Sequence, residues 1–111
     1  MKIRFLYSEQ CPSHDEALQR LRSILLEEGV VENVEVIKVE TFEEANREHF
    51  PGSPTIFIDG RDIDPVTVAQ YAPTCRAYRL GDGRISPLPS VQMIRRAVRK
   101  AMENPKSTNT G

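Results

Sequence analysis

The residues best suited to chemistry in this chain lie in the tetrapeptide Cys11-Pro12-Ser13-His14, where a short apolar strand pattern ends and an amphipathic helix pattern begins. A thiol at a helix start is favoured as a thiolate, because the unpaired N–H groups and the positive end of the helix dipole stabilise negative charge there. Pro12 suits the first helical position, where its missing N–H would have no partner anyway. The sequence therefore predicts a reactive Cys11, with a small buried apolar cysteine as the alternative.

His14 occupies the position, one helical turn after Cys11, at which a Cys-x-x-Cys site has its second sulfur. Histidine can neither form nor break a disulfide, so thiol chemistry at this site is either carried by Cys11 alone or lost. A protonated imidazole beside Cys11 would stabilise the thiolate, whereas the helix dipole disfavours that cation. We therefore expect His14 either to act with Cys11 as a modest tuner of its thiolate or to be a solvated side chain.

Cys75 is the second cysteine, and it follows a polar, proline-punctuated connection, residues 61–74, to which the sequence assigns no structure. If residues 76–80 form a strand antiparallel to residues 55–58, Cys75 lies about 17 Å from the Cys11 end of the sheet. A disulfide needs Cα atoms within about 7 Å of each other. We therefore expect Cys75 to be a buried structural thiol, and a resolving thiol only if the connection returns it to Cys11.

A metal site made of two cysteines and two histidines is a further alternative, and its ligands would be Cys11, His14, His49 and Cys75. Only the Cys-x-x-His pair has the tight spacing of metal ligands, and nothing in the spacing brings His49 and Cys75 to it. We therefore expect no metal.

Hydrophobic periodicity predicts four strands and three helices. The strands are expected at residues 3–8, 34–39, 55–58 and 76–80, and the helices from 12 to Gly29, from a capping box at Thr41 and Glu44 to about 50, and from 91 to 102. Turns are expected at 59–60 and 81–83. This order, βαβαββα, predicts an α/β domain over residues 1–103, with a small mixed sheet and helices on both faces. The polar tail, residues 104–111, is expected to be disordered.

Composition narrows the classes of function. The chain has 111 residues, 39% of them hydrophobic and 28% charged, with a net charge of −1, so nothing in its overall charge favours binding to nucleic acid or to an anionic membrane. No run approaches the length of a membrane span, and the N-terminus lacks the apolar core of a signal peptide. We therefore expect a cytoplasmic protein whose two cysteines are reduced.

The strand before Cys11, the proline after it and the segment Gly52-Ser53-Pro54-Thr55 together resemble the thioredoxin-fold superfamily. More specifically, the chain resembles small bacterial thioredoxin-like proteins of glutaredoxin size that begin with a Cys-Pro-x-Cys site and carry Gly-Ser-Pro-Thr before the third strand. The resemblance implies a thioredoxin-like, glutaredoxin-size βαβαββα fold. The chain departs from the family pattern at His14, which replaces the second cysteine.

The resemblance also implies roles. Cys11 would be the nucleophile of a monothiol thiol–disulfide exchange, and a cis Pro54 would lie beside it. Pro12, Ser53 and Pro54 would bind substrate, the last two by offering free backbone groups to an extended chain. The partner would be a protein disulfide or a small thiol such as glutathione, with no other cofactor. Two alternatives stay open: a redox-inactive module that binds through the groove beside Pro54, and an iron–sulfur cluster held by Cys11 and an external thiol.

Overall fold

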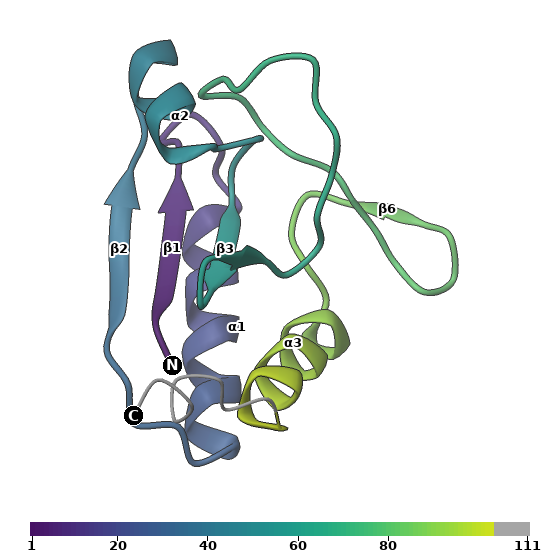
Figure 1. Cartoon of the computed structure of the whole chain (residues 1–111). Coiled ribbons are helices and arrows are strands. Elements are labelled where there is room, and N and C mark those ends of the chain that lie inside the picture. Colours follow the sequence, from purple (N-terminus) through teal and green to yellow (C-terminus); the bar gives the residue numbers. More distant parts are fainter. Residues whose placement is uncertain (104–111) are drawn as a thin grey trace.

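A computed structural model describes residues 1–103, whose central sheet has the strand order β2-β1-β3-β4. The strands are β1 (Ile3–Tyr7), β2 (Val34–Lys38), β3 (Thr55–Ile58) and β4 (Arg61–Asp62), and the helices are α1 (His14–Glu27), α2 (Phe42–Glu48) and α3 (Val91–Glu103). β1 pairs in parallel with β2 and antiparallel with β3, and β4 pairs antiparallel with β3 (Figure 1). A right-handed helical crossover through α1 is the expected link between the two parallel strands.

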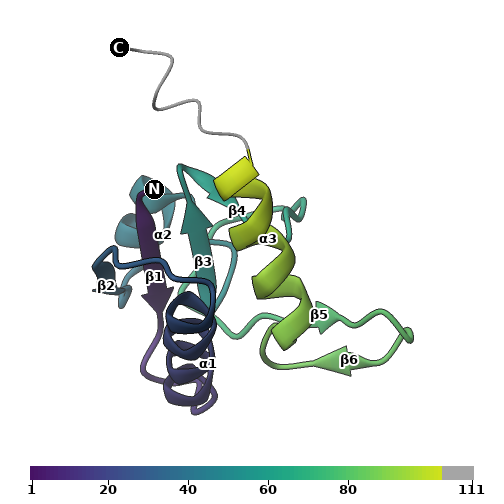
Figure 2. The same ribbon diagram turned by 90° about the horizontal axis from the view of Figure 1, so that it is seen from below.

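The two faces of the sheet carry separate apolar cores. Helices α1 and α3 pack against one face, where Ile3, Phe5 and Ile56 are buried with apolar residues of both helices (Figure 2). On the other face Leu6 packs with Phe50 and with residues around α2. Because successive strand residues point to opposite faces, a strand covered on both sides reads as nearly continuous apolar sequence, as β1 does. The domain is therefore of the α/β class, with a mixed sheet and helices on both faces, as predicted.

The start of α1 differs from the prediction. The helix begins at His14, so Pro12 precedes it and is not its first residue. The Cys11 N–H donates to the Ser8 carbonyl at 3.0 Å, and the His14 N–H donates to the Cys11 carbonyl at 3.4 Å. These two bonds close turns in succession, so Cys11 sits in a turn between β1 and α1.

Helix α2 begins as predicted. Thr41 accepts a hydrogen bond from the Glu44 N–H at 3.0 Å, and the Glu44 carboxylate accepts one from the Thr41 N–H at 3.2 Å. This reciprocal pair is the capping box. The helix ends at Glu48, and the left-handed backbone of the capping residue His49 turns Phe50 into the core.

The fourth strand of the sheet is not the predicted one. β4 follows the Asp59-Gly60 turn directly and takes the free edge of β3. Residues 78–79 instead form β5 (Tyr78–Arg79), which pairs with β6 (Ile85–Ser86) in a hairpin that projects away from the sheet (Figure 2). Since β4 already occupies the edge, the chain after Asp62 is free to return toward Cys11.

The expected disordered tail, residues 104–111, lies outside the described residues. Among residues 1–103, no helix combines the length and the apolar character that crossing a membrane requires.

Candidate functional site

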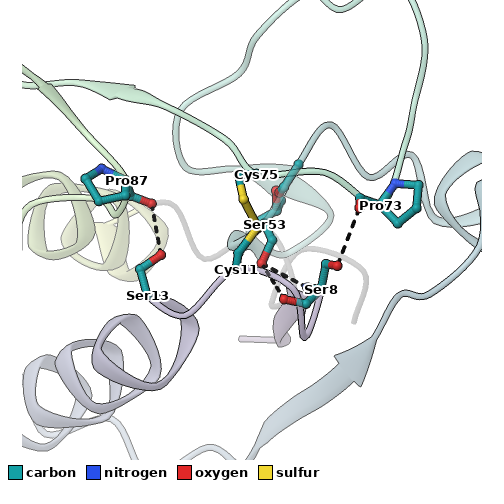
Figure 3. Close-up of a disulfide and its surroundings, with 9 residues drawn as sticks. Ser8, Cys11, Ser13, Ser53, Pro73, Cys75 and Pro87 are labelled. Atoms are coloured by element: carbon teal, nitrogen blue, oxygen red, sulfur yellow. Dashed lines mark hydrogen bonds between the residues drawn. A yellow bond between two sulfur atoms is a disulfide. The ribbon is translucent and has the colours of Figure 1, made fainter.

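A disulfide joins Cys11 to Cys75, with 2.13 Å between the sulfurs and 5.7 Å between the Cα atoms (Figure 3). The prediction that these residues lie too far apart is therefore wrong. The Ser53 N–H donates to the Thr74 carbonyl at 2.7 Å, and the Arg76 N–H donates to the Ser53 carbonyl at 2.9 Å. These bonds pair Cys75 with Ser53 in a parallel bridge and hold it opposite Cys11.

The Ser53–Pro54 peptide bond is cis, as predicted. The Ser53 hydroxyl oxygen accepts a hydrogen bond from the Ser8 N–H at 2.9 Å, which fixes the segment to the end of β1 beside the disulfide (Figure 3). However, the backbone N–H and carbonyl of Ser53 are already used by residues 74–76. The expectation that Ser53 offers free backbone groups to a substrate is therefore wrong for this state, because a segment of the same chain occupies them.

The two sulfur-bearing residues differ in exposure. Cys11 is 1% exposed and belongs to the core, whereas Cys75 is an exposed residue. Cys11 lies in a turn that its N–H closes by a bond to the buried Ser8, whereas Cys75 lies in a loop between two residues that bond to Ser53. The expectation that Cys75 is a buried thiol is thus wrong, and the environment of the disulfide is asymmetric.

The remaining predicted site residues lie near Cys11 in sequence but contact other groups. The His14 ring packs on Tyr7, with 4.4 Å between ring centroids, and its Nδ1 lies 3.3 Å from an Asp15 carboxylate oxygen. Pro12 is exposed on the surface next to Cys11. The contacts of the His14 side chain therefore place it between β1 and the first turn of α1, and its effect on Cys11 stays a prediction.

Gly52 makes the close approach of the Cys75 segment possible. Its φ is +149°, and a Cβ built on it would lie 2.8 Å from the Arg76 Cβ and 3.2 Å from the Cys75 carbonyl oxygen. Real Cβ atoms do not approach that closely, and the backbone conformation favours glycine. Gly52 is therefore the residue that lets residues 75–76 pack directly against the strand entry.

A buried guanidinium anchors the residue after Cys75. The Arg76 side chain is only 3% exposed, and it forms a two-point ion pair with Asp62 of β4, with N–O distances of 2.9 and 3.2 Å. It also donates to the Thr55 hydroxyl at 3.0 Å and to the Asp64 carbonyl. Burial raises the pKa of Asp62, and the hydrogen bond from Arg76 opposes that shift. Arg76 thus ties the disulfide loop to the far edge of the sheet.

Tyr78 completes this buried group. The Arg76 guanidinium carbon lies 4.3 Å from the centroid of the Tyr78 ring, and the Tyr78 hydroxyl donates to the Pro54 carbonyl. Burial raises the pKa of Tyr78 well above its ordinary value, and the positive charge of Arg76 only partly opposes this. The neutral phenol is therefore the form that the folded chain holds.

This shift predicts alkaline instability. The folded-state pKa of Tyr78 lies above the unfolded value of about 10, so above that pH the unfolded chain binds fewer protons and the free energy of unfolding falls. In Tyr78→Phe the loss between pH 9 and 11 should be smaller than in the wild type, although the variant is less stable at pH 7 by about 1 kcal/mol for the lost hydrogen bond. Urea unfolding across this pH range measures both. Parallel pH profiles of the two proteins would contradict the prediction.

The four residues of the metal alternative do not meet. His49 lies at the end of α2 with its ring against Tyr71, at 5.2 Å between centroids, and both cysteines are consumed by the disulfide. Over residues 1–103 no group of three or more histidine, cysteine or acidic side chains is placed to hold a metal ion.

Arg76, Asp62 and Tyr78 were not predicted as parts of the site. One signal was present: Arg76 and Tyr78 alternate with Ala77 and Arg79, so a strand pattern puts the first two on one face. Asp62 had no such signal, because it lies in the connection to which the sequence assigns no structure. Comparison of this chain with protein-family models, with curated proteins and with solved structures finds no match.

Proposed function

We propose that this chain is a thioredoxin-like protein that performs thiol–disulfide exchange through the pair Cys11 and Cys75. The observation that carries the proposal is that two cysteines 64 residues apart in sequence meet in a disulfide at the end of the sheet. With a second sulfur in reach, no external thiol is needed to resolve a mixed disulfide. The pair mechanism therefore replaces the monothiol mechanism that the sequence predicts, and it gives Cys75 the role that was expected only if the connection returned it to Cys11.

The electron balance of the proposed reaction is simple. The disulfide accepts two electrons from two external thiols. The external thiols become one external disulfide, and Cys11 and Cys75 become thiols. In the opposite direction the reduced pair reduces an external disulfide and closes again. Each half-reaction passes through a mixed disulfide between one cysteine and one external sulfur. The co-reactants are a small thiol such as glutathione, or a protein thiol or disulfide.

The arrangement around the pair supports the thioredoxin-like part of the proposal. One cysteine follows the first strand and precedes the first helix, and a cis proline precedes the antiparallel third strand beside it. The parallel pair of β1 and β2, joined through α1, is the predicted βαβ unit, and β3 pairs antiparallel with β1. Fold alone would not assign a function, so the proposal depends on the sulfur pair.

The alternative function, a redox-inactive module that binds an extended peptide beside Pro54, is less favoured. The Ser53 backbone groups that such a peptide would use are bonded to Thr74 and Arg76. The proposal includes a cytoplasmic location. Cytosolic disulfides are usually transient and catalytic, which fits a bridge that opens and closes during exchange. In that compartment the reducing thiol pool would open the Cys11–Cys75 bridge in each cycle.

Single-cysteine variants test the proposal. The wild type, with both cysteines reduced, should exchange with glutathione disulfide and return to an intramolecular disulfide. Neither Cys11→Ser nor Cys75→Ser should pass beyond a single mixed disulfide, and both should lose catalytic turnover, as followed by the release of thiol and by intact mass. Turnover that persists in either variant would contradict the pair mechanism.

A matched control separates the pair from a merely exposed thiol. Ser23 is exposed on α1, so the triple variant Cys11→Ser, Cys75→Ser, Ser23→Cys carries one surface thiol away from the site. It should form a mixed disulfide at the rate of a simple thiol and never turn over. If it matched the wild type, the proposed function would fail.

A further inference from the structure

We infer that external sulfur compounds react at Cys75, and that Cys11 is the resolving sulfur, the reverse of the roles expected from the sequence. This inference rests on the proposed function and assigns the reacting atom within it. Its basis is the asymmetry of the pair: Cys11 is 1% exposed, and Cys75 is exposed.

The direction of attack makes this asymmetry decisive. A thiolate displaces a disulfide sulfur from the side opposite the bond that breaks, and which sulfur is attacked depends on access. To attack Cys11, the incoming thiolate would have to approach from behind it, through the packed interior where Ser8 and Ser53 are also buried. To attack Cys75, it approaches from the outside of the loop. The burial of Cys11 and the exposure of Cys75 therefore favour the second path while the protein is folded.

The leaving group also favours attack at Cys75. Attack at Cys75 expels Cys11 as a thiolate at the N-terminal approach to α1, three residues before the helix begins. The helix dipole stabilises negative charge at that end, and a leaving thiol of lower pKa leaves faster. Attack at Cys11 would instead expel Cys75, a loop residue that no helix follows directly in the chain.

The atoms and electrons of the proposed steps balance with external thiols and disulfides as the only reagents. An external thiolate forms a bond to the Cys75 sulfur, the Cys11–Cys75 bond breaks, and Cys11 keeps the electron pair. A second external thiolate then attacks the external sulfur of the mixed disulfide, which releases the external disulfide and leaves the Cys75 thiolate. In the other direction, the Cys75 thiolate attacks an external disulfide, and Cys11 then attacks the Cys75 sulfur and expels the external thiol. Backbone bonds from Ser53 to residues on either side of Cys75 keep the two sulfurs near each other throughout.

Trapping the mixed disulfide tests the inference. The oxidised wild-type protein is mixed with glutathione without oxygen, quenched within seconds by N-ethylmaleimide at acidic pH, and digested for mass spectrometry. Glutathione should be found on Cys75 and maleimide on Cys11, in about tenfold or greater excess over the reverse labelling, because access decides which sulfur is attacked.

The same protein unfolded in guanidinium is the control, because both sulfurs are then accessible and the two adducts should form in similar amounts. Glutathione mainly on Cys11 of the folded protein, or equally on both cysteines, would overturn the inference while the exchange activity survives. If the folded protein forms no adduct and is not reduced at any glutathione concentration, the inference and the proposed function both fail.

Discussion

Replacing Arg76 by methionine should lower the free energy of unfolding by about 3–5 kcal/mol at pH 7. The substitution keeps an unbranched apolar stem but leaves the Asp62 carboxylate buried without its partner, and it removes the donors to Thr55 and to the Asp64 carbonyl. Breaking a buried pair by removing one partner is costly because the other charge stays desolvated. Urea unfolding of the oxidised proteins measures the loss.

Two further variants make this prediction specific. Arg79 lies three residues later, on the exposed side of β5. The variant Arg79→Met should change the free energy of unfolding by less than about 0.5 kcal/mol. Adding Asp62→Asn to Arg76→Met should recover part of the lost free energy of unfolding, because it removes the buried charge that has no partner in Arg76→Met. An Arg76→Met protein as stable as Arg79→Met would show that the buried ion pair does not anchor the loop.

Reducing the Cys11–Cys75 disulfide should lower the free energy of unfolding by about 4 kcal/mol. The bridge spans 64 residues, and a cross-link of that span removes much of the conformational entropy of the unfolded chain. The folded state should change little, since Ser53, Arg76 and Tyr78 hold the loop by contacts that do not involve sulfur. Urea unfolding with and without a phosphine reductant measures the difference.

The double variant Cys11→Ala, Cys75→Ala is the control for the reductant. Its unfolding should match that of the reduced wild type within about 1 kcal/mol and should not respond to the phosphine, since it has no disulfide to lose. Equal unfolding midpoints for the oxidised and the reduced wild type would contradict the prediction.

Local patterns in the sequence predict most of the fold. The capping box at Thr41, the apolar run of β3 and the amphipathic face of α3 each depend on neighbouring residues, and the structure contains all three. The cis bond before Pro54 was predicted from a family resemblance, since base rates for proline would not favour it. The sequence thus predicts the three helices, the first three strands and the location of Cys11 between the first strand and the first helix.

The position of Cys75 could not be predicted, because it depends on a choice between two edge strands. A run of two residues, Arg61 and Asp62, takes the edge of β3, and periodicity cannot detect so short a strand. Once that edge is filled, residues 63–74 are free to cross back, and the Arg76–Asp62 pair fixes where they end. The pairing of a buried arginine with an aspartate fourteen residues earlier is a tertiary contact with no local signature.

The span of the disulfide also determines how the chain responds to mechanical tension. When the two ends of the described chain are pulled apart, the load passes from Cys11 to Cys75 through the sulfur bridge, and α1, β2, α2, β3 and β4 lie outside its path. A fully extended chain gains about 3.5 Å per residue, so the bridge withholds about 220 Å of contour length. After a thiol has opened the bridge, this length is released when the enclosed elements unfold under load, so the extensibility of the domain depends on its oxidation state.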